Sequence, residues 1–479
     1  MKLILNKPKY EHLIREIITA YIPRLKIETT ASVPSDDDYV LVNITEDDNI
    51  THYSATVSID GTRYSNTITE TTPHKLTVSR LVGDLLKKHI NVDLPWGILT
   101  GIRPAKMVRE MRNKGMSFGD IAETFEKDYS VHTDKTGLAI DVAKKEIEII
   151  NSINPKAVSL YIGIPFCPTR CLYCSFTSQS IKFSNTLVEP YMDALFKEID
   201  YLAEHLSTTS TPIETIYIGG GTPTALSERN LERLMHKIDN SFDLSYAKEY
   251  TVEAGRPDTI TKEKLITLKN AGVSRISINP QTMHQKTLDI IGRCHTPDDI
   301  VNCYNMATQL GFDHINTDLI AGLPGEEAED FEYTLERIKE LDPSSVTVHT
   351  MSVKHGSYLD MNYSMYTPTA TAKVNRMLKD ADTMLRSMGK EPYYLYRQKN
   401  MLGNLENVGY CTPGNECLYN IYIMEEVQSI FSLGAGGSTK LVRGDNIERV
   451  FNVKEVAEYI KRIDEMIDRK KSLFRKEEQ

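Results

Sequence analysis

The sequence predicts an α/β protein organised around a partial (β/α)6 barrel, with a small α+β domain before it and a mostly helical region after it. Two observations carry this prediction. Between residues 157 and 349, short apolar segments alternate with amphipathic ones, which is typical of parallel strands joined by helices. The pattern holds six repeats, too few for a closed eight-stranded barrel, and therefore favours an open one.

Each predicted element follows from its local pattern. The strands expected in the barrel are 157–163, 213–219, 249–253, 275–278, 314–320 and 345–349. The helices expected between them are 186–205, 228–239, 262–271, 298–310 and 328–341. In the N-terminal domain we expect strands at 2–6, 39–45, 52–59 and 62–67, and helices at 11–21 and 74–90. Asp60-Gly61 is a hairpin signal between the last two of these strands.

These elements divide the chain into four expected parts. They are a small α+β N-terminal domain (1–92), a helical connector (93–154), the barrel (155–355) and a mostly helical C-terminal region (356–479). The clearest C-terminal helices are 370–387 and 453–470. The segment 393–426 is rich in Tyr and Asn, and we expect it to cover the mouth of the barrel.

Composition excludes several classes of function. The net charge of −10 and the absence of a basic tract argue against a nucleic-acid partner. No apolar run reaches membrane-spanning length, and charges follow the first apolar residues too closely for a signal peptide. The 7 cysteines are an odd number and do not make a disulfide scaffold, which favours a reducing, cytoplasmic compartment.

Three cysteines lie close together after the first barrel strand. Cys167, Cys171 and Cys174 are spaced Cys-x3-Cys-x2-Cys. Cysteine sulfur is the soft ligand that zinc and iron–sulfur clusters prefer. Structural zinc usually takes four ligands, and no fourth Cys or His lies within ten residues. The alternative, three free core cysteines, is disfavoured because such residues have no reason to cluster.

The cysteine motif also carries a resemblance to a known family. With Tyr173 before its last cysteine, it resembles the cluster loop of radical S-adenosylmethionine (SAM) enzymes. The wider stretch YIGIPFC resembles the branch that contains oxygen-independent coproporphyrinogen III oxidase and a related heme chaperone. WGILTGIRP, YYLYRQKN and NVGY resemble HemZ-type coproporphyrinogen dehydrogenases. The resemblance implies a radical SAM barrel over about 155–350 and a [4Fe–4S] cluster held by the three cysteines.

The resemblance also implies a set of cofactor contacts at the carboxyl ends of the strands, where ligands bind in parallel βα folds. They are Tyr161, Tyr173, Gly220, Gly221, Thr222, Glu253, Gln281, Arg293 and Asp318. The last three match positions that contact a second SAM, so the number of bound SAM molecules, one or two, stays open. Alternative interpretations are a tight turn for the glycines, core packing for the tyrosines and a salt-bridged rim residue for Glu253.

Clustered cations are candidates for substrate binding. Arg103, Lys106 and Arg109 fall three residues apart on nearly one helical face, and Arg397 and Lys399 lie further along the chain. A substrate with several carboxylates would need such charges. The alternative interpretation is a solvated cationic face.

The implied reaction is the radical SAM oxidative decarboxylation of two propionates of coproporphyrinogen III, giving the vinyl groups of protoporphyrinogen IX through a 5′-deoxyadenosyl radical. The implied partner is a low-potential electron donor such as flavodoxin or ferredoxin. Alternatives are a heme chaperone-like heme-binding protein and a radical SAM enzyme acting on another tetrapyrrole. The sequence names no catalytic residue.

Two departures from the relatives bear on these alternatives. The oxidase has a further cysteine where this chain has Phe176. The chaperone has a His-Asn motif where this chain reads Leu418-Tyr419-Asn420. We therefore expect that no fourth thiol near the cluster takes part in the mechanism. We also expect that the protein binds no heme through a histidine.

Overall fold

The computed structural model divides into two compact units. It describes residues 1–34, 37–71, 75–101, 103–176, 179–366, 369–398, 401–444 and 446–475. Unit 1 consists of Met1–Ala143, Ala370–Asn375 and Tyr396–Glu406. Unit 2 consists of Lys144–Thr369, Arg376–Leu395 and Asn407–Gln479. The four-part division of the sequence stays a prediction.

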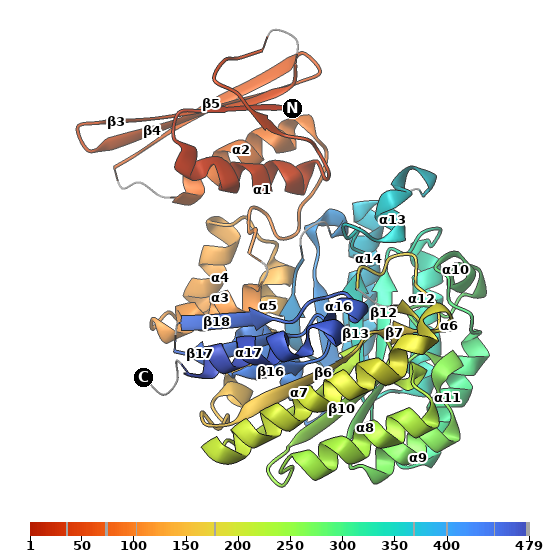
Figure 1. Cartoon of the computed structure of the whole chain (residues 1–479). Coiled ribbons are helices and arrows are strands. Elements are labelled where there is room, and N and C mark those ends of the chain that lie inside the picture. The colour runs from red at the N-terminus through yellow and green to blue at the C-terminus, as the bar shows by residue number, and fades with distance from the viewer. Residues whose placement is uncertain are drawn as a thin grey trace. The chain divides into compact units, whose positions relative to one another are not determined.

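Unit 1 contains a five-stranded sheet of order β2-β1-β3-β4-β5. Its strands are β1 (Lys2–Leu5), β2 (Glu28–Thr29), β3 (Tyr39–Asp47), β4 (Ile50–Ile59) and β5 (Thr62–Glu70). Helices α1 (Glu11–Tyr21) and α2 (Lys75–His89) lie side by side against one face of this sheet (Figure 1). Asp60 and Gly61 both have positive φ, as a two-residue hairpin turn of type I′ requires. The predicted N-terminal elements are confirmed, except that residue 74 lies outside the described residues.

The rest of unit 1 is helical and is joined through buried polar contacts. Its helices are α3 (Pro104–Asn113), α4 (Phe118–Lys127) and the first part of α5 (Thr133–Ile150). The buried carboxylate of Glu406 accepts hydrogen bonds from Trp96 Nε1 (2.6 Å) and Lys135 Nζ (2.5 Å). These contacts tie the segment 396–406 to a turn 310 residues earlier, at Trp96, and to α5 271 residues earlier, at Lys135.

Unit 2 is built on an eleven-stranded sheet of order β14-β15-β13-β12-β11-β10-β9-β6-β16-β17-β18. Its central strands are parallel and are β6 (Val158–Ile164), β9 (Ile213–Gly220), β10 (Glu249–Gly255), β11 (Arg275–Ile278), β12 (His314–Ala321) and β13 (Ser345–Thr350). These are the strands expected for the partial barrel, and that prediction is confirmed.

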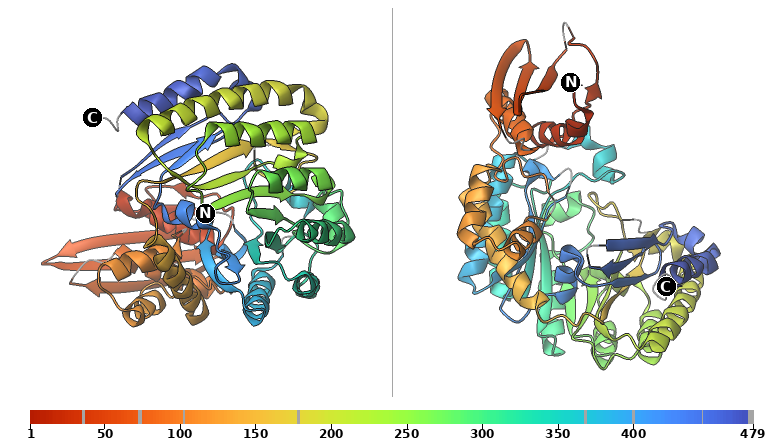
Figure 2. Two further views of the ribbon diagram at one scale, coloured as in Figure 1. Left: turned by 90° about the horizontal axis from the view of Figure 1, so that it is seen from below. Right: turned by 90° about the vertical axis from the view of Figure 1, so that its left-hand side faces the viewer.

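Helices cover the outer face of this sheet (Figure 2). They are α7 (Val188–Thr209), α8 (Glu228–Ser241), α9 (Lys262–Asn270), α11 (Pro297–Gln309) and α12 (Ala328–Leu341), with the short α6 (Ile181–Ser184) and α10 (Gln285–Ile290). Ser227, Thr261 and Thr296 start α8, α9 and α11 because each side chain accepts a hydrogen bond from a free backbone N–H of the first turn. Between the helices and strands lies one apolar core, which includes Leu195, Ile218 and Ile276.

The chain after residue 355 contains helices, as expected, and also strands that the sequence did not predict. Most of it belongs to unit 2, and residues 370–375 and 396–406 belong to unit 1. Its helices are α13 (Tyr358–Met361), α14 (Thr371–Ser387), α15 (Leu418–Glu425), α16 (Val456–Lys461) and α17 (Ile463–Phe474). Its strands are β14 (Glu391–Tyr396), β15 (Asn407–Cys411), β16 (Ile430–Leu433), β17 (Ser438–Arg443) and β18 (Asn446–Phe451). They extend both ends of the central sheet. No helix in the described part of the chain is long and apolar enough to span a membrane.

Candidate cofactor site

The three clustered cysteines lie where the first parallel strand ends. β6 leads into the short strand β7 (Phe166–Cys167), and Cys171 and Cys174 follow on one loop. None of them is in a disulfide. Burial raises the pKa of the Cys174 thiol, and the nearby Cys171 and Cys167 raise it further. Three thiols this close would repel one another as thiolates, and a bound metal cluster removes that repulsion by replacing their protons.

The donor set fits a [4Fe–4S] cluster. No group of three or more His, Cys, Asp or Glu side chains in the described part of the chain could hold a single metal ion. A cubane cluster instead takes one thiolate on each of several irons, so its ligands need not converge on one point. Three cysteines would hold three irons and leave the fourth for a small molecule.

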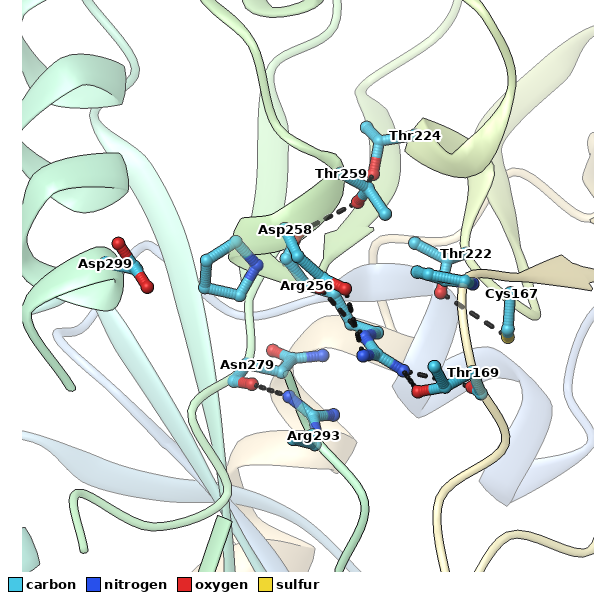
Figure 3. Close-up of polar contacts among 12 residues, drawn as sticks. Cys167, Thr169, Thr222, Thr224, Arg256, Asp258, Thr259, Asn279, Arg293 and Asp299 are labelled. Atoms are coloured by element: carbon cyan, nitrogen blue, oxygen red, sulfur yellow. Dashed lines mark hydrogen bonds and ion pairs between the residues drawn. The ribbon is translucent and has the colours of Figure 1, made fainter. Parts of the chain in front are cut away.

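A buried arginine holds the first half of this loop, and sequence analysis missed it. Arg256 follows β10 and forms two 3.0 Å contacts with the Asp258 carboxylate. It also donates hydrogen bonds to the backbone oxygen (3.0 Å) and to Oγ1 (2.9 Å) of Thr169 (Figure 3). Thr169 Oγ1 in turn donates to the carbonyl of Gly292 (3.0 Å). The Cys167–Cys171 segment is therefore shaped by protein contacts before any metal binds.

The second half of the loop is held by backbone contacts. Leu172 N donates to the carbonyl of Ile291 (3.0 Å), and Leu359 N donates to the carbonyl of Leu172 (2.9 Å). Arg170 Nη2 donates to the carbonyl of Gly356 (2.8 Å). The loop thus lies between the turn after α10 and the start of α13.

Arg293 lies against the cysteines themselves. Its buried guanidinium donates a hydrogen bond to the carbonyl of Asn279 (Figure 3) and also contacts Cys171 and the Tyr173 hydroxyl. Burial alone would lower the pKa of Arg293, but its hydrogen bonds and charge interactions with Tyr173 and Cys171 raise it. The guanidinium therefore stays charged beside the cluster ligands.

The turn after β9 brings backbone close to the cysteine loop. Gly221 N donates to the carbonyl of Ile164 (2.8 Å), and Thr222 N donates to that of Phe166 (2.7 Å). A Cβ on Gly221 would lie 2.6 Å from the Phe166 oxygen, so only glycine fits there. Thr222 Oγ1 lies 3.5 Å from Cys167 Sγ. The glycine turn and the cysteine loop form one surface.

Glu253 is a partly buried carboxyl group beside this turn. Its Oε1 accepts a hydrogen bond from the Tyr217 hydroxyl (2.7 Å) and its Oε2 accepts one from Gly220 N (3.2 Å). Burial raises its pKa to about 7, even though the Tyr217 hydrogen bond favours the ionised form. The partners of Glu253 are a hydroxyl and a backbone N–H, so this carboxyl group is a candidate hydrogen-bond acceptor for a ligand.

Three tyrosine rings pack together beside Glu253. The Tyr217 ring stacks on Tyr419 of α15 with centroids 4.6 Å apart, and Tyr161 lies 6.2 Å from each of them. Leu418 N donates to the Glu249 carboxylate (2.7 Å), which caps α15 and fixes Tyr419 in this position. Tyr161 and Tyr217 thus have a packing role, and Tyr161 also borders Gly220.

Gln281 and Asp318 lie together on neighbouring strands. Gln281 has a φ of 68° and its N donates to the carbonyl of Asp318 (2.9 Å). The Asp318 carboxylate accepts a hydrogen bond from Asn316 (2.8 Å) and lies 3.8 Å from His349 Nε2. Burial would raise its pKa, but the contacts with His349 and Asn316 lower it overall. Asp318 also interacts electrostatically with Glu253, which joins both residues to the site.

The structure brings the predicted cofactor contacts into one connected group in unit 2, and three of the predicted substrate cations belong to unit 1. Arg103 precedes α3 and Lys106 and Arg109 lie within it, all in unit 1. Lys399 lies outside the described residues.

Arg397 also lies within unit 1. Its buried guanidinium lies over Trp96, with the ring centroid 5.3 Å away. It donates hydrogen bonds to the backbone oxygens of Leu99 (2.6 Å), Gly101 (3.2 Å) and Asn404 (2.9 Å). These hydrogen bonds hold Arg397 within unit 1, and its part in substrate binding stays a prediction.

Comparisons with known proteins agree with this geometry. Residues 161–338 match the model of the radical SAM superfamily. The oxygen-independent coproporphyrinogen-III oxidase-like protein HemZ of Bacillus subtilis is 41% identical over 401 residues, which cover 83% of this chain and 80% of HemZ. The chain belongs to the oxygen-independent coproporphyrinogen III oxidase-like family of radical SAM proteins.

This oxidase-like family includes proteins named for different functions. The heme chaperone HemW of Lactococcus lactis is 30% identical over 328 residues, covering 67% of this chain and 80% of HemW. The fold resembles that of coproporphyrinogen III oxidase (HemN) from Escherichia coli, with a TM-score of 0.54 at 23% identity over 68% of this chain and 73% of HemN. The radical SAM fold of this oxidase-like protein is therefore shown, and it implies a [4Fe–4S] cluster and SAM.

Proposed function

We propose that this protein is an oxygen-independent coproporphyrinogen III oxidase, which converts two propionates of coproporphyrinogen III to vinyl groups and yields protoporphyrinogen IX. The observation that carries the proposal is the continuity of the cysteine loop with the Gly220–Thr222 turn and Glu253. When bound, the cluster and SAM supply a one-electron cleavage that produces a 5′-deoxyadenosyl radical able to abstract hydrogen. The protein binds, orients and shields these groups.

Individual residues have proposed roles in that site. Cys167, Cys171 and Cys174 hold the cluster, and the backbone of Gly220 and Gly221 admits SAM close to it. Glu253 accepts hydrogen bonds from the ligand, because its carboxylate is already oriented by Tyr217. Tyr161 borders this position. The remaining proposed contacts are Tyr173, Thr222, Gln281, Arg293 and Asp318, and whether they serve one SAM molecule or two stays open.

The substrate is proposed from the relatives, whose names include coproporphyrinogen III oxidases. Arg103, Lys106 and Arg109 stay candidates for its carboxylates. A thiolate-bound cluster requires a reducing compartment, which supports the cytoplasm as the proposed location. The low-potential electron donor is proposed to be a protein such as flavodoxin or ferredoxin.

The test is an anaerobic reaction with reconstituted protein, SAM, reductant and coproporphyrinogen III, analysed by mass spectrometry. We expect 5′-deoxyadenosine whose formation depends on coproporphyrinogen III. The porphyrinogen should lose one and then two units of carbon dioxide plus two hydrogens. Equal 5′-deoxyadenosine formation with and without the porphyrinogen, and no decarboxylated product, would refute the substrate. Other tetrapyrroles would then be tested in the same assay.

A heme chaperone is the second candidate, because HemW proteins are among the relatives. Tyr419 stands where the chaperone motif has a histidine, and it is buried in the tyrosine stack. Burial raises the pKa of its hydroxyl well above 10, which disfavours a phenolate ligand for iron. We expect no stoichiometric His-ligated heme in the visible spectrum of heme-titrated protein. Its appearance would favour the chaperone.

A further inference from the structure

An exposed apolar surface lies beside the cysteine loop. Among the described residues, large apolar side chains that are well exposed include Phe176 (62%), Tyr358 (51%), Met361 (64%) and Met365 (73%). We call these four residues the docking patch. Large exposed apolar side chains gathered from two segments are uncommon on soluble proteins and mark binding surfaces.

Contacts with the cysteine loop bring the two segments of the patch together. Phe176 follows Cys174 by two residues, and the Lys354 ammonium lies over its ring, 5.6 Å from the centroid. The backbone bond from Leu359 to Leu172 attaches α13, which carries Tyr358 and Met361, to the same loop (Figure 1). Both segments of the patch therefore adjoin the loop that carries the proposed cluster ligands.

Two cations border the patch, although the whole chain carries a net charge of −10. Arg170 and Lys354 border it, and both interact with the cysteine loop. The acid of α13, Asp360, lies 3.2 Å from His355 and also accepts a hydrogen bond from Gly356 N (3.3 Å). The Asp360 carboxylate therefore already has partners within the protein.

We propose that the docking patch binds a small acidic electron carrier of the flavodoxin type, which passes one electron to the cluster. This inference rests on the proposed function, since it requires a cluster at the three cysteines. In the transfer, the carrier's reduced flavin loses one electron and the oxidised cluster gains it. Electron tunnelling falls steeply with distance, so a carrier must dock over the loop that holds the cluster.

The chemistry of the patch suits a transient complex. Electron-transfer complexes bury small interfaces, below about 1,200 Å² in total, which a few side chains can supply. Methionine adapts its shape to different partners, and Met361 and Met365 supply half of the patch. Arg170 and Lys354 complement an acidic carrier and speed its association at low salt.

The test compares a protein reductant with a chemical one. Met361→Glu and Met365→Glu place carboxylates in the patch, while Phe451→Glu places one on the distant strand β18, where the side chain is 56% exposed. Cluster reduction is followed by its visible absorbance, with reduced flavodoxin or dithionite, and flavodoxin binding is measured separately by titration. We expect the patch variants to lose about tenfold or more in flavodoxin binding and reduction rate, because like charges oppose association. Dithionite reduction should be unchanged, and Phe451→Glu should behave as wild type.

Three other outcomes would overturn the docking proposal. If flavodoxin reduces the patch variants as fast as wild type, the carrier docks elsewhere. If dithionite reduction or SAM binding is lost as well, the patch belongs to the cofactor site. If the variants change the molecular mass in solution, the patch is an interface between copies of the chain. If the wild-type protein forms no 5′-deoxyadenosine with dithionite, the proposed function is refuted instead.

Discussion

Removing the Tyr217 hydroxyl should shift the pH dependence of SAM binding. Tyr217→Phe keeps the ring that stacks on Tyr419 but deletes the 2.7 Å hydrogen bond to Glu253. A hydrogen bond to a charged group contributes about 1.5–3 kcal/mol. Because one pKa unit corresponds to about 1.4 kcal/mol, the pKa of Glu253 should rise from about 7 by roughly 1–2 units.

The consequence for binding follows from the ionised fraction. Near pH 7.5 this fraction falls from about three quarters to roughly one tenth, so SAM affinity should fall about eightfold. Near pH 9.5 both proteins are almost fully ionised, and the difference should be small. Anaerobic equilibrium dialysis with reconstituted protein measures the dissociation constant across this range. SAM's own amine titrates identically with both proteins, so their comparison isolates Glu253.

Tyr250→Phe is the matched control, because Tyr250 lies on the same strand as Glu253 but its hydroxyl faces Met235 in the helix layer. It should bind SAM as wild type does. Superimposable pH profiles for wild type and Tyr217→Phe would refute the reasoning. A pH-independent loss would show that Tyr217 acts through packing and not through the charge of Glu253.

Other substitutions test the cluster loop and the buried acids. Cys171→Ala should abolish reconstitution to about four irons per chain, while Cys303→Ala, a buried cysteine on α11, should not, as iron analysis would show. Arg256→Gln should lower iron incorporation because Thr169 loses two hydrogen bonds, whereas Arg233→Gln on α8 should not; equal iron contents would contradict this. Burial raises the pKa of Glu326 to about 7, so its stabilising contribution is complete below about pH 4.5 and is lost as pH rises through 7. Glu326→Gln should therefore raise the free energy of unfolding near pH 8 by up to about 3 kcal/mol, and by much less near pH 5, which melting temperatures at the two pH values would show. An equal rise in melting temperature at both pH values would contradict this prediction.

Local patterns predicted the central elements because their signals lie within a few residues. Alternating apolar segments located the parallel strands, and the cysteine and glycine spacings located the cofactor loops. The site residue Arg256 was missed because the stretch Arg-Pro-Asp resembles a surface turn. Its burial arises only when Thr169, 87 positions earlier, folds onto it.

Long-range contacts explain the missed strands and the burial of Arg397. β15 contains Gly409, a weak strand former, but a Cβ there would lie 1.9 Å from the Tyr394 ring, so the glycine admits that ring. The partner that makes β15 a strand is β13, far earlier in the chain. The hydrogen-bond acceptors of Arg397 at Leu99 are 298 positions away. A local charge pattern cannot distinguish such a buried group from a solvated one.

The position of β6 sets an order for biosynthesis. This strand, which leads into the cysteine loop, pairs in parallel with β9 on one side and with β16 on the other. A ribosome finishes β16 roughly 270 residues after β6, which takes about 15–50 s at 5–20 residues per second. Until then the nascent chain presents one unpaired edge of β6 to chaperones and to other chains. The sheet beside the cysteine loop is therefore complete only after nearly the whole polypeptide has emerged.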